Sequence, residues 1–511
     1  MCGVIGIHGT GEEAARQTYF ALFAVQHRGQ ESAGIAIGDG QQLREHTGMG
    51  LVSRVFSEKD LDALVGHIAV GHCRYSTTGS SSEENIQPIL RRPRAAGHPV
   101  GCSGLEPIGA FALAHNGNIV NALELRADPT LAAHARSSTS DTAVVAELIA
   151  HAPGDSIEDR VAEVVPRLRG SFSFVMATAR QLIGVRGGLG NRPLALGRLG
   201  DGWMLASETC AFDSVGATFV RDVRPGEIVV IDHLGVRSRQ LDLPPRVAMC
   251  AFEFIYFQRP DSRVDGRLIH SVRREMGRLL ARQQPTAADL VVGVPDSAIA
   301  AATGFAEAAG LPYADGFVRN RYIGRTFIEP TQWLRRSGAR LKYNPLPEVV
   351  AGKRVVLLDD TIVRGTTQHQ LVGMLREEGG AREVHVRITA PPVRWPCFLG
   401  IDIPEPDELI AHDLDVEQIR ERIGADSLVY LTVENLVEAI AIGAGQLCLG
   451  CFTRDYPIEV QLPLDKLALE RPSGLQRVMV FPHDAGPDQT SDPPAEGAAT
   501  DEETGVLTVP A

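Results

Sequence analysis

The sequence predicts a protein of two parts, the first α+β and the second α/β, and three observations lead to this expectation. The chain has 511 residues, more than a single hydrophobic core usually organises. In the first half, short apolar runs and glycine-rich turns surround two helical patterns, which is typical of stacked sheets covered by helices. From about Ser271 onward, continuous apolar runs alternate with helical segments, as in a buried parallel sheet with crossover helices.

Short apolar runs predict the strands of the first half, at Cys2–Ile7, Ile68–Arg74, Ala110–Ala114, Phe172–Ala177 and Ile228–Ile231. Two helices are expected there, one over Glu12–Gln26 and one after Ser140, where Asp141 opens an apolar-periodic run to Ala150. In the second half the strands are expected at Leu290–Val294, Arg354–Leu358 and Val384–Ile388. The helices between them are expected at Ala298–Ala309 and near Gln368–Glu378.

Composition separates three regions along the chain. We expect one domain over residues 2–245 and a second over residues 246–465, with the boundary near Pro244–Asp265. After Pro472 the chain holds seven acidic residues and one arginine, with many Pro, Gly and Thr residues. Such a segment buries too little apolar surface to fold, so an acidic disordered tail is predicted over residues 472–511.

The charge and hydropathy of the chain exclude two classes of function. The net charge of −13 argues against nonspecific nucleic-acid binding, which needs a basic face. No signal peptide or uncharged apolar stretch of membrane-spanning length is visible, so we expect no membrane partner and a cytoplasmic location. In that compartment the eight cysteines should be reduced, ligated or catalytic.

Cys2 is the first candidate catalytic residue. Removal of Met1 would leave Cys2 with a free α-amine beside its thiol, so one residue would carry both nucleophile and base. The amine has an unperturbed pKa of about 7.7–8.0 and can accept the thiol proton near neutral pH. A cysteine at position 2 is weak evidence alone, but other motifs accompany it.

Those motifs are Cys2-Gly3-Val4-Ile5-Gly6-Ile7, Gln26-His27-Arg28-Gly29, His72-Cys73-Arg74-Tyr75-Ser76-Thr77, His115-Asn116-Gly117-Asn118 and Ser140-Asp141-Thr142. In this order they resemble the glutaminase domain of the class II, N-terminal-nucleophile amidotransferases. The resemblance implies an α/β/β/α sandwich in which Asn116 and Gly117 donate hydrogen bonds to an oxyanion. It also implies that Arg74 and Asp141 bind the glutamine carboxylate and ammonium, and that Arg28 binds or supports the carboxylate side.

Each of these residues is also compatible with a purely structural role. Asn116-Gly117 is compatible with a plain turn formed by an Asn-Gly pair. Arg74 is compatible with a surface charge at a strand end. Asp141 is compatible with a helix N-cap.

The segment from Val355 to Thr367 is the second strong motif. An apolar strand ends in Asp359 and Asp360, and a loop with Thr361, Arg364, Gly365, Thr366 and Thr367 precedes a helix. Backbone N–H groups at a helix N-terminus form a phosphate site, and the acids suit ribose hydroxyls or hydrated Mg²⁺. Without the loop that follows, a pair of acids after a strand often has only a structural role.

This segment resembles the phosphoribosyl pyrophosphate (PRPP) loop of type I phosphoribosyltransferases, which have a parallel sheet. The resemblance implies that Ser297, in Val294-Pro295-Asp296-Ser297, joins Asp359 and Asp360 around Mg²⁺. It further implies that Asn320–Ile328, continuing to Arg340-Leu341-Lys342, is a mobile loop whose Lys342 meets the pyrophosphate. A solvated basic loop is the alternative for any one of its charges.

Cys250, Cys397, Cys448 and Cys451 suggest a metal site, and their spacing does not decide between zinc and an iron–sulfur cluster. Unligated thiols are the remaining alternative. Residues 1–465 together resemble the amidophosphoribosyltransferase family. The resemblance implies its iron–sulfur branch, with these four residues holding a [4Fe–4S] cluster of structural role. It also implies Mg²⁺, the substrates glutamine and PRPP, feedback by purine nucleotides and a homotetramer.

Three other functions compete with this interpretation. A different class II amidotransferase would explain the first half but not Asp359–Thr367. A regulator that senses PRPP would not need Cys2, Asn116 and Asp141. A phosphoribosyltransferase that uses a free base would not need residues 1–240.

Overall fold

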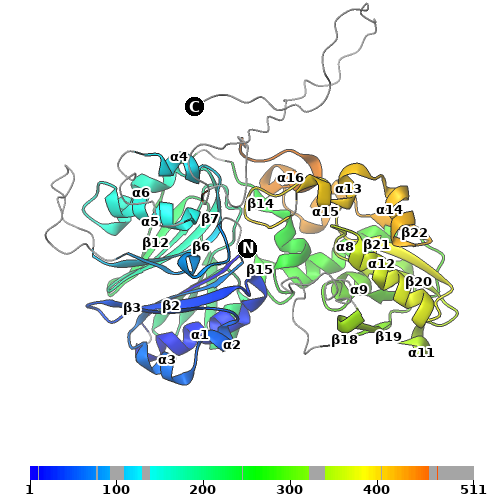
Figure 1. Ribbon diagram of the computed structural model, residues 1–511, viewed down its shortest axis with the longest axis horizontal. Helices are drawn as coiled ribbons and strands as arrows, with labels where there is room; N and C mark the ends of the chain where they lie inside the picture. The colour runs from blue at the N-terminus through cyan, green and yellow to red at the C-terminus, as the bar shows by residue number, and fades with distance from the viewer. Residues whose placement is uncertain are drawn as a thin grey trace, which may run out of the picture.

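The computed structural model describes residues 1–9, 11–75, 79–91, 109–128, 139–243, 246–320, 340–403, 405–459 and 469 (Figure 1). The predicted tail over residues 472–511 and most of the predicted mobile loop lie outside these ranges. The described part forms two bodies of regular structure, a first half up to residue 243 and a second half from residue 246.

Two antiparallel sheets form the centre of the first half. The larger sheet has the order β11 (Thr218–Asp222), β9 (Ala195–Leu199), β10 (Gly202–Ala206), β1 (Gly3–His8), β4 (Ile68–Arg74), β2 (Ser32–Gly38) and β3 (Leu43–Met49). The smaller sheet has the order β13 (Gly235–Gln240), β12 (Glu227–Asp232), β8 (Leu182–Arg186), β7 (Gly170–Thr178), β6 (Phe111–Ile119) and β5 (Ile89–Arg91). Strand β1 therefore lies in the interior of its sheet, between β10 and β4.

Three apolar layers hold these sheets and their helices together. Val4, Val70 and Val175 belong to the layer between the two sheets. A second layer packs α1 (Ala14–Ala24) and α7 (Cys210–Val215) on the outer face of the larger sheet. A third packs α5 (Asp141–His151) and α6 (Ile157–Val164) on the smaller sheet. The expected α/β/β/α sandwich is confirmed, and Figure 1 shows its layers edge-on.

A parallel sheet forms the core of the second half. Its order is β17 (Leu290–Gly293), β20 (Arg354–Asp359), β21 (Glu383–Ile388) and β22 (Ser427–Tyr430), with every neighbour parallel. The helices of this half are α8 (Ile269–Gln283), α9 (Ile299–Ala309), α11 (Pro347–Val350), α12 (Thr366–Gly373), α13 (Ile410–Asp413), α14 (Val416–Ile423), α15 (Val433–Ile440) and α16 (Gly450–Thr453). The predicted parallel-sheet class is therefore confirmed.

Smaller helices and strand pairs accompany these elements. In the first half these are the helices α2 (Val52–Val55), α3 (Glu58–Ala63) and α4 (Ala122–Arg126). In the second half they are the strand pairs β14 (Met249–Cys250) with β23 (Leu447–Cys448), β15 (Arg263–Val264) with β16 (Arg267–Leu268), and β18 (Phe317–Arg319) with β19 (Tyr343–Pro345). A π-helical turn over Glu253–Phe257 follows β14.

Strand β6 differs from its prediction in a way that matters for function. The predicted strand stops at Ala114, and Asn116-Gly117 is expected in a turn. Instead β6 continues to Ile119, and Gly117 and Asn118 pair with Phe172 and Ser171 of β7. The turn interpretation is wrong because the pairing with β7 continues through these polar residues.

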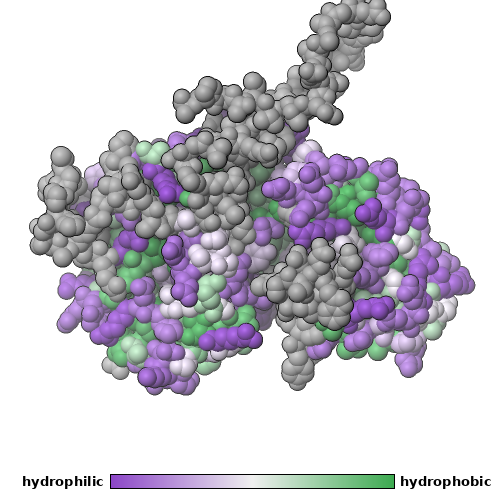
Figure 2. All heavy atoms as spheres, viewed as in Figure 1, coloured by the Kyte–Doolittle hydropathy of each residue, from purple (hydrophilic) through white to green (hydrophobic). Residues whose placement is uncertain are grey.

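Two observations concern the hydropathy of the described residues. None of the helices within those ranges has the length and hydropathy needed to cross a bilayer. On the face shown in Figure 2, hydrophilic side chains predominate and the apolar ones form separate spots.

Candidate active sites

Cys2 lies at the start of the interior strand β1 and is 5% exposed. Its backbone nitrogen, which would become the α-amine after Met1 is removed, donates to Asn116 Oδ1 at 3.1 Å. Its Sγ lies 3.5 Å from the Tyr75 carbonyl oxygen. Met1 itself is 1% exposed, and burial lowers the pKa of its amine to about 5.

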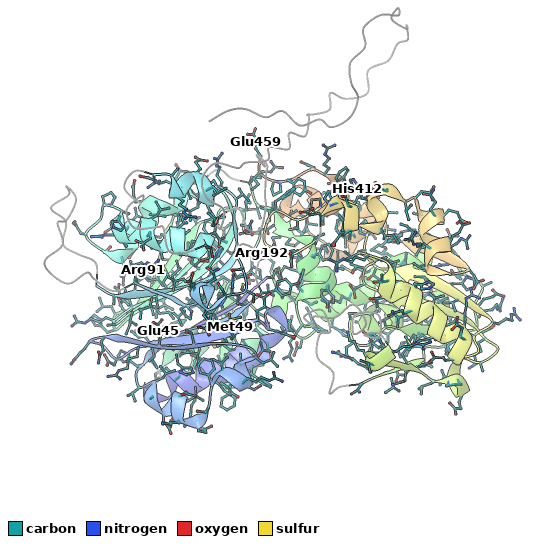
Figure 3. All side chains as sticks on the ribbon, in the orientation of Figure 1. Glu45, Met49, Arg91, Arg192, His412 and Glu459 are labelled. Atoms are coloured by element: carbon teal, nitrogen blue, oxygen red, sulfur yellow. The ribbon has the colours of Figure 1, made fainter. Side chains whose placement is uncertain are left out.

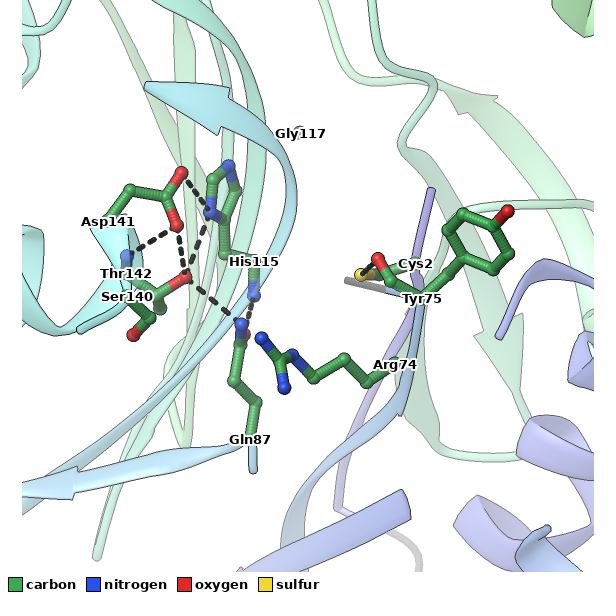
Figure 4. A pocket seen from close by; sticks show the side chains of 9 residues that line it. All are labelled: Cys2, Arg74, Tyr75, Gln87, His115, Gly117, Ser140, Asp141 and Thr142. Carbon is green, nitrogen blue, oxygen red and sulfur yellow. Dashed lines mark hydrogen bonds and ion pairs between the residues drawn. The ribbon is translucent and has the colours of Figure 1, made fainter. Parts of the chain in front are cut away.

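A pocket opens beside the Cys2 thiol (Figure 4). Three elements contribute most of its wall: the end of β4, the polar part of β6 and the start of α5. The lining residues are Cys2, Arg74, Tyr75, Gln87, His115, Gly117, Ser140, Asp141 and Thr142. The structure therefore brings together four of the expected glutaminase residues, Cys2, Arg74, Gly117 and Asp141, with Asn116 hydrogen bonded to Cys2.

Asn116 is fully buried, and its two side-chain atoms have different surroundings. Oδ1 accepts the hydrogen bond from the Cys2 nitrogen. Nδ2 is buried and has no hydrogen-bond partner within the part of the chain that the structure describes. A buried amide donor without a partner costs about 1–3 kcal/mol. Nδ2 is therefore a buried donor with the capacity to bind an acceptor beside Cys2.

Asp141 and Arg74 lie on opposite sides of this pocket (Figure 4). Asp141 accepts from Ile119 N at 3.0 Å and from Thr142 N at 2.8 Å. Arg74 is 3% exposed and donates to the Ser80 carbonyl at 3.0 Å. The N-cap interpretation of Asp141 is wrong, because Ser140 caps α5 by accepting from Ala143 N, and Asp141 is the first helical residue.

Arg28 does not line the pocket. Its Nε donates to the Cys2 carbonyl at 3.0 Å, and its Nη atoms bind Glu208 at 2.6 Å and Glu253 at 2.9 Å. Its side chain is fully buried. These contacts suit the supporting role, which is one of the two roles expected for Arg28 from the sequence.

Sequence reasoning gave no role to several pocket residues. Gln87 accepts from His115 N at 2.8 Å and donates to Thr142 Oγ1 at 3.0 Å, which ties three segments together. His115 Nδ1 lies 3.0 Å from Thr142 Oγ1, and burial lowers the pKa of His115. His115 and Thr142 belong to motifs of the sequence, but Gln87 carries no local signal because its partners are distant in the chain.

Asp359 and Asp360 form the second site, at the carboxyl end of β20. Both are 7% exposed, and Asp359 Oδ1 accepts from the Asp360 nitrogen at 2.9 Å. Gln368 donates to Asp359, and Thr361 donates to Asp360 at 2.7 Å. Burial, with the neighbouring Asp360 carboxylate, raises the pKa of Asp359 well above its ordinary value. A cation bound between the two adjacent carboxylates would offset their repulsion.

The loop after these acids leads into α12 at the position that the sequence predicts. Gly365 has φ +80°, and a Cβ there would lie 2.5 Å from Ile410 Cδ1. Glycine adopts this left-handed conformation without strain, whereas most other residues do not. Thr366 and Thr367 are the first residues of α12 and are exposed. Arg364 is half-exposed and forms an ion pair with Glu408.

Ser297 and Lys342 approach the same edge of the sheet. Ser297 follows β17, which pairs with β20 in parallel register, so both strands end side by side. Lys342 precedes β19, and its charge opposes the rise in the pKa of Asp359. Arg319 forms an ion pair with Asp296 in the loop that holds Ser297. Residues 321–339 of the predicted loop are outside the description.

Backbone contacts gather the four remaining candidate cysteines. Cys250 and Cys448 are register partners in the β14–β23 pair. The Cys451 carbonyl accepts from Arg394 N at 3.0 Å and Trp395 N at 3.1 Å, close to Cys397 in the chain. Burial raises the pKa of the Cys451 thiol well above its ordinary value, and the thiols of Cys448, Cys397 and Cys250 raise it further.

All four of these cysteines are free thiols in the structure. Among the described residues, no group of three or more His, Cys, Asp or Glu side chains is arranged to hold a metal. The thiols of Cys250, Cys397 and Cys448 nevertheless act on Cys451, so the four cysteines lie in one region. A set of four thiols is a donor set that suits zinc as well as an iron–sulfur group.

Comparisons with known proteins agree with the geometry of both sites. A family model for a glutamine amidotransferase domain matches residues 103–214. An amidophosphoribosyltransferase of Mycobacterium tuberculosis is 48% identical over 470 residues, which cover 90% of this chain and 86% of the relative. One of Bacillus subtilis is 46% identical, covering 90% of this chain and 94% of the relative.

A solved structure matches the same span. It is a glutamine PRPP amidotransferase from B. subtilis complexed with ADP and GMP, with a TM-score of 0.82 and 45% identity. The match covers 90% of this chain and 98% of the solved one.

Proposed function

Because this chain belongs to the amidophosphoribosyltransferase family, we propose that it moves the amide nitrogen of glutamine to C1 of PRPP. Water is consumed, and 5-phosphoribosylamine, glutamate and pyrophosphate are formed, which is the first committed step of purine synthesis. The single observation that best supports this reaction is the Cys2–Asn116 pair. There the incipient amine is already oriented, and the donor atom Nδ2 has no partner among the described residues.

The first step begins when removal of Met1 frees the α-amine of Cys2. The amine takes the thiol proton, and the thiolate attacks the amide carbon of glutamine. Asn116 Oδ1 accepts from the amine nitrogen at 3.1 Å and so orients its lone pair. The oxyanion that develops receives hydrogen bonds from Asn116 Nδ2 and the Gly117 N–H. Collapse of the intermediate passes the proton to the leaving nitrogen, releases ammonia and leaves a thioester, which water hydrolyses to glutamate.

Two charged residues orient the substrate in this pocket. Arg74 binds the α-carboxylate and Asp141 the α-ammonium of glutamine, since both line the pocket from opposite sides. Arg28 acts behind them, because its Nε holds the Cys2 carbonyl. The nucleophile is thus fixed from its backbone as well as from its amine.

The second step occurs at the carboxyl end of the parallel sheet. Backbone N–H groups of the loop from Thr361 to Thr367 bind the 5-phosphate at the start of α12. Asp359, Asp360 and Ser297 would hold the ribose hydroxyls and Mg²⁺, and Lys342 would meet the pyrophosphate. When bound, Mg²⁺ would supply positive charge that offsets the negative charge of the pyrophosphate. Ammonia attacks C1 as the bond to pyrophosphate breaks, and a water-excluded path between the sites keeps the ammonia unprotonated.

Measurement of glutamate release tests this function. We expect purified protein to release glutamate from glutamine slowly alone and much faster with PRPP and Mg²⁺, with pyrophosphate formed in equal amount. A different amidotransferase would release glutamate without regard to PRPP. A PRPP-sensing regulator would release none, and either result would contradict the proposal.

Cys250, Cys397, Cys448 and Cys451 hold a [4Fe–4S] cluster in this proposal. The cluster supplies cross-linking rather than redox chemistry, since the reaction transfers no electrons. Anaerobically purified protein should be brown and contain about four irons per chain. A Cys451→Ser variant should lose the iron and melt at lower temperature, whereas Cys210→Ser, another buried thiol, should keep both. The assignment would be disproved if the wild-type protein were colourless and the Cys451→Ser variant melted at the same temperature as the wild type.

Three further properties belong to the same proposal. Purine nucleotides act as feedback inhibitors, supported by the ADP and GMP in the B. subtilis structure. The enzyme is a cytoplasmic homotetramer. Its domains comprise residues 2–245 and 246–465, followed by the acidic tail.

A further inference from the structure

Residues Phe398, Leu399 and Gly400, here called the buttress segment, belong to the second half but bind the first. The Phe398 carbonyl accepts from Asn118 Nδ2 at 2.9 Å. The Leu399 carbonyl accepts from Arg192 Nε at 3.1 Å and also from Arg192 Nη2. The Phe398 carbonyl is thereby fixed to strand β6, and the Leu399 carbonyl is fixed to Arg192.

Gly400 then contacts the backbone of Gly117 directly. A Cβ at Gly400 would lie 2.9 Å from Gly117 C, 3.0 Å from Gly117 O and 3.1 Å from Gly117 Cα. All three atoms are backbone, so a side chain at Gly400 has no flexible neighbour to displace. Gly117 also has little room to move toward β7, because a Cβ built on it would lie 1.9 Å from Ser171 O of that strand. The Gly117 peptide is held between β7 and the buttress segment.

Arg192 secures this arrangement at the junction of the two halves (Figure 3). Its side chain is fully buried. Besides Leu399, it contacts Ser171 Oγ at 3.2 Å and Glu253 Oε1 at 3.3 Å. The same arginine therefore binds β7, the π-helical turn after β14, and the buttress segment. Such a shared, buried cation keeps the three elements in a fixed relation.

We propose that Gly400 is a positioning residue of the glutaminase site: the second half supplies the wall that places the Gly117 peptide beside Asn116. This inference rests on the proposed function, in which Gly117 donates to the oxyanion. A displacement of about 1 Å in such a site can cost about 10²-fold in rate. Efficient glutamine hydrolysis thus requires the contact between the buttress segment and Gly117. In this proposal the first half does not supply that contact itself.

A Gly400→Ala variant tests the proposal, with Gly424→Ala as its matched control. Both glycines have positive φ, +103° and +76°, so both variants carry backbone strain in the second half. A Cβ at Gly424 meets nothing within 4 Å. At saturating PRPP, Gly400→Ala should lower kcat for glutamine by about 10²-fold relative to Gly424→Ala. KM for glutamine should stay within about twofold, because the lost interaction forms only in the transition state.

Alkylation of Cys2 by iodoacetamide separates a positioning role from a general structural one. In this displacement the thiolate sulfur forms a bond to carbon while iodide leaves, and the thiol proton passes to the amine. No oxyanion develops, so Gly117 contributes nothing. The alkylation rate of Gly400→Ala should therefore match that of Gly424→Ala within about twofold while glutamine hydrolysis falls.

An Asn118→Ala variant provides a second route if Gly400→Ala does not yield folded protein. It removes the hydrogen bond to the Phe398 carbonyl and should lower kcat for glutamine by about tenfold, again with unchanged alkylation. Synthesis of phosphoribosylamine from ammonium salts should be unaffected in every variant, which confirms that the second half is folded.

Equal kcat values for Gly400→Ala and Gly424→Ala would overturn the inference, and so would a parallel loss of alkylation. For Asn118→Ala, an unchanged kcat or reduced alkylation would do the same. Failure of the proposed function has a different signature. In that case the wild type itself would show no PRPP-stimulated release of glutamate.

Discussion

A Cys2→Ala variant is expected to lose glutamine-dependent synthesis of phosphoribosylamine on the order of 10³-fold or more, while synthesis from ammonium salts is unchanged. The thiol is the only nucleophile in the first step, so its removal prevents formation of the thioester. The second site stands apart from it, at the carboxyl end of β20, and can use ammonia from solution.

Both reactions can be measured on one preparation by following pyrophosphate release with either nitrogen source. Alanine at position 2 still permits removal of Met1, so the comparison isolates the thiol. Cys210→Ala removes another buried thiol, in α7, and should retain both activities. Glutamine-dependent activity that survives in Cys2→Ala would show that another group attacks the amide.

A Glu253→Gln variant is expected to destabilise the junction of the two halves by about 3–5 kcal/mol. Glu253 accepts from Arg28 at 2.9 Å and from Arg192 at 3.3 Å, and all three side chains are at most 3% exposed. The change leaves two buried guanidinium groups with Glu208 as the remaining carboxylate of the network. Burying a charge without its partner is costly, because water cannot replace the lost interaction.

Thermal unfolding measures this effect, and the apparent melting temperature should fall by about 5 °C or more. Glu307→Gln is the matched control, since Glu307 pairs with Arg274 and Arg278 on the surface with its side chain 53% exposed. Exposed pairs contribute little, so this control should melt close to the wild type. Equal melting temperatures for the two variants would show that the buried network adds no net stability.

Local patterns were sufficient to predict the strand, loop and helix start that carry the second candidate site. The apolar run that ends in Asp359, followed by Gly365 and two threonines, contains its strand, loop and helix start within a few residues. The geometry of this segment depends on its own backbone preferences, so it can be predicted from the sequence alone. The same holds for β4, which spans Ile68–Arg74 as expected.

The junction could not be predicted in this way. Asn116-Gly117 has the composition of a turn, yet it lies in β6 because β7 and Cys2 supply its partners. Arg192 and Gly400 carry no local signal, since the atoms that they contact lie about 200 and 280 positions away in the chain. Such roles arise from packing between distant segments, which a single sequence does not display.

The enclosure of Met1 sets an order of events in the life of the chain. Met1 is 1% exposed and packs with the apolar core of the second half, and the strand behind it is interior to its sheet. An aminopeptidase needs an extended, accessible terminus to cut the first peptide bond. Removal of Met1 from the folded chain would therefore require the contacts between Met1 and the second-half core to open first.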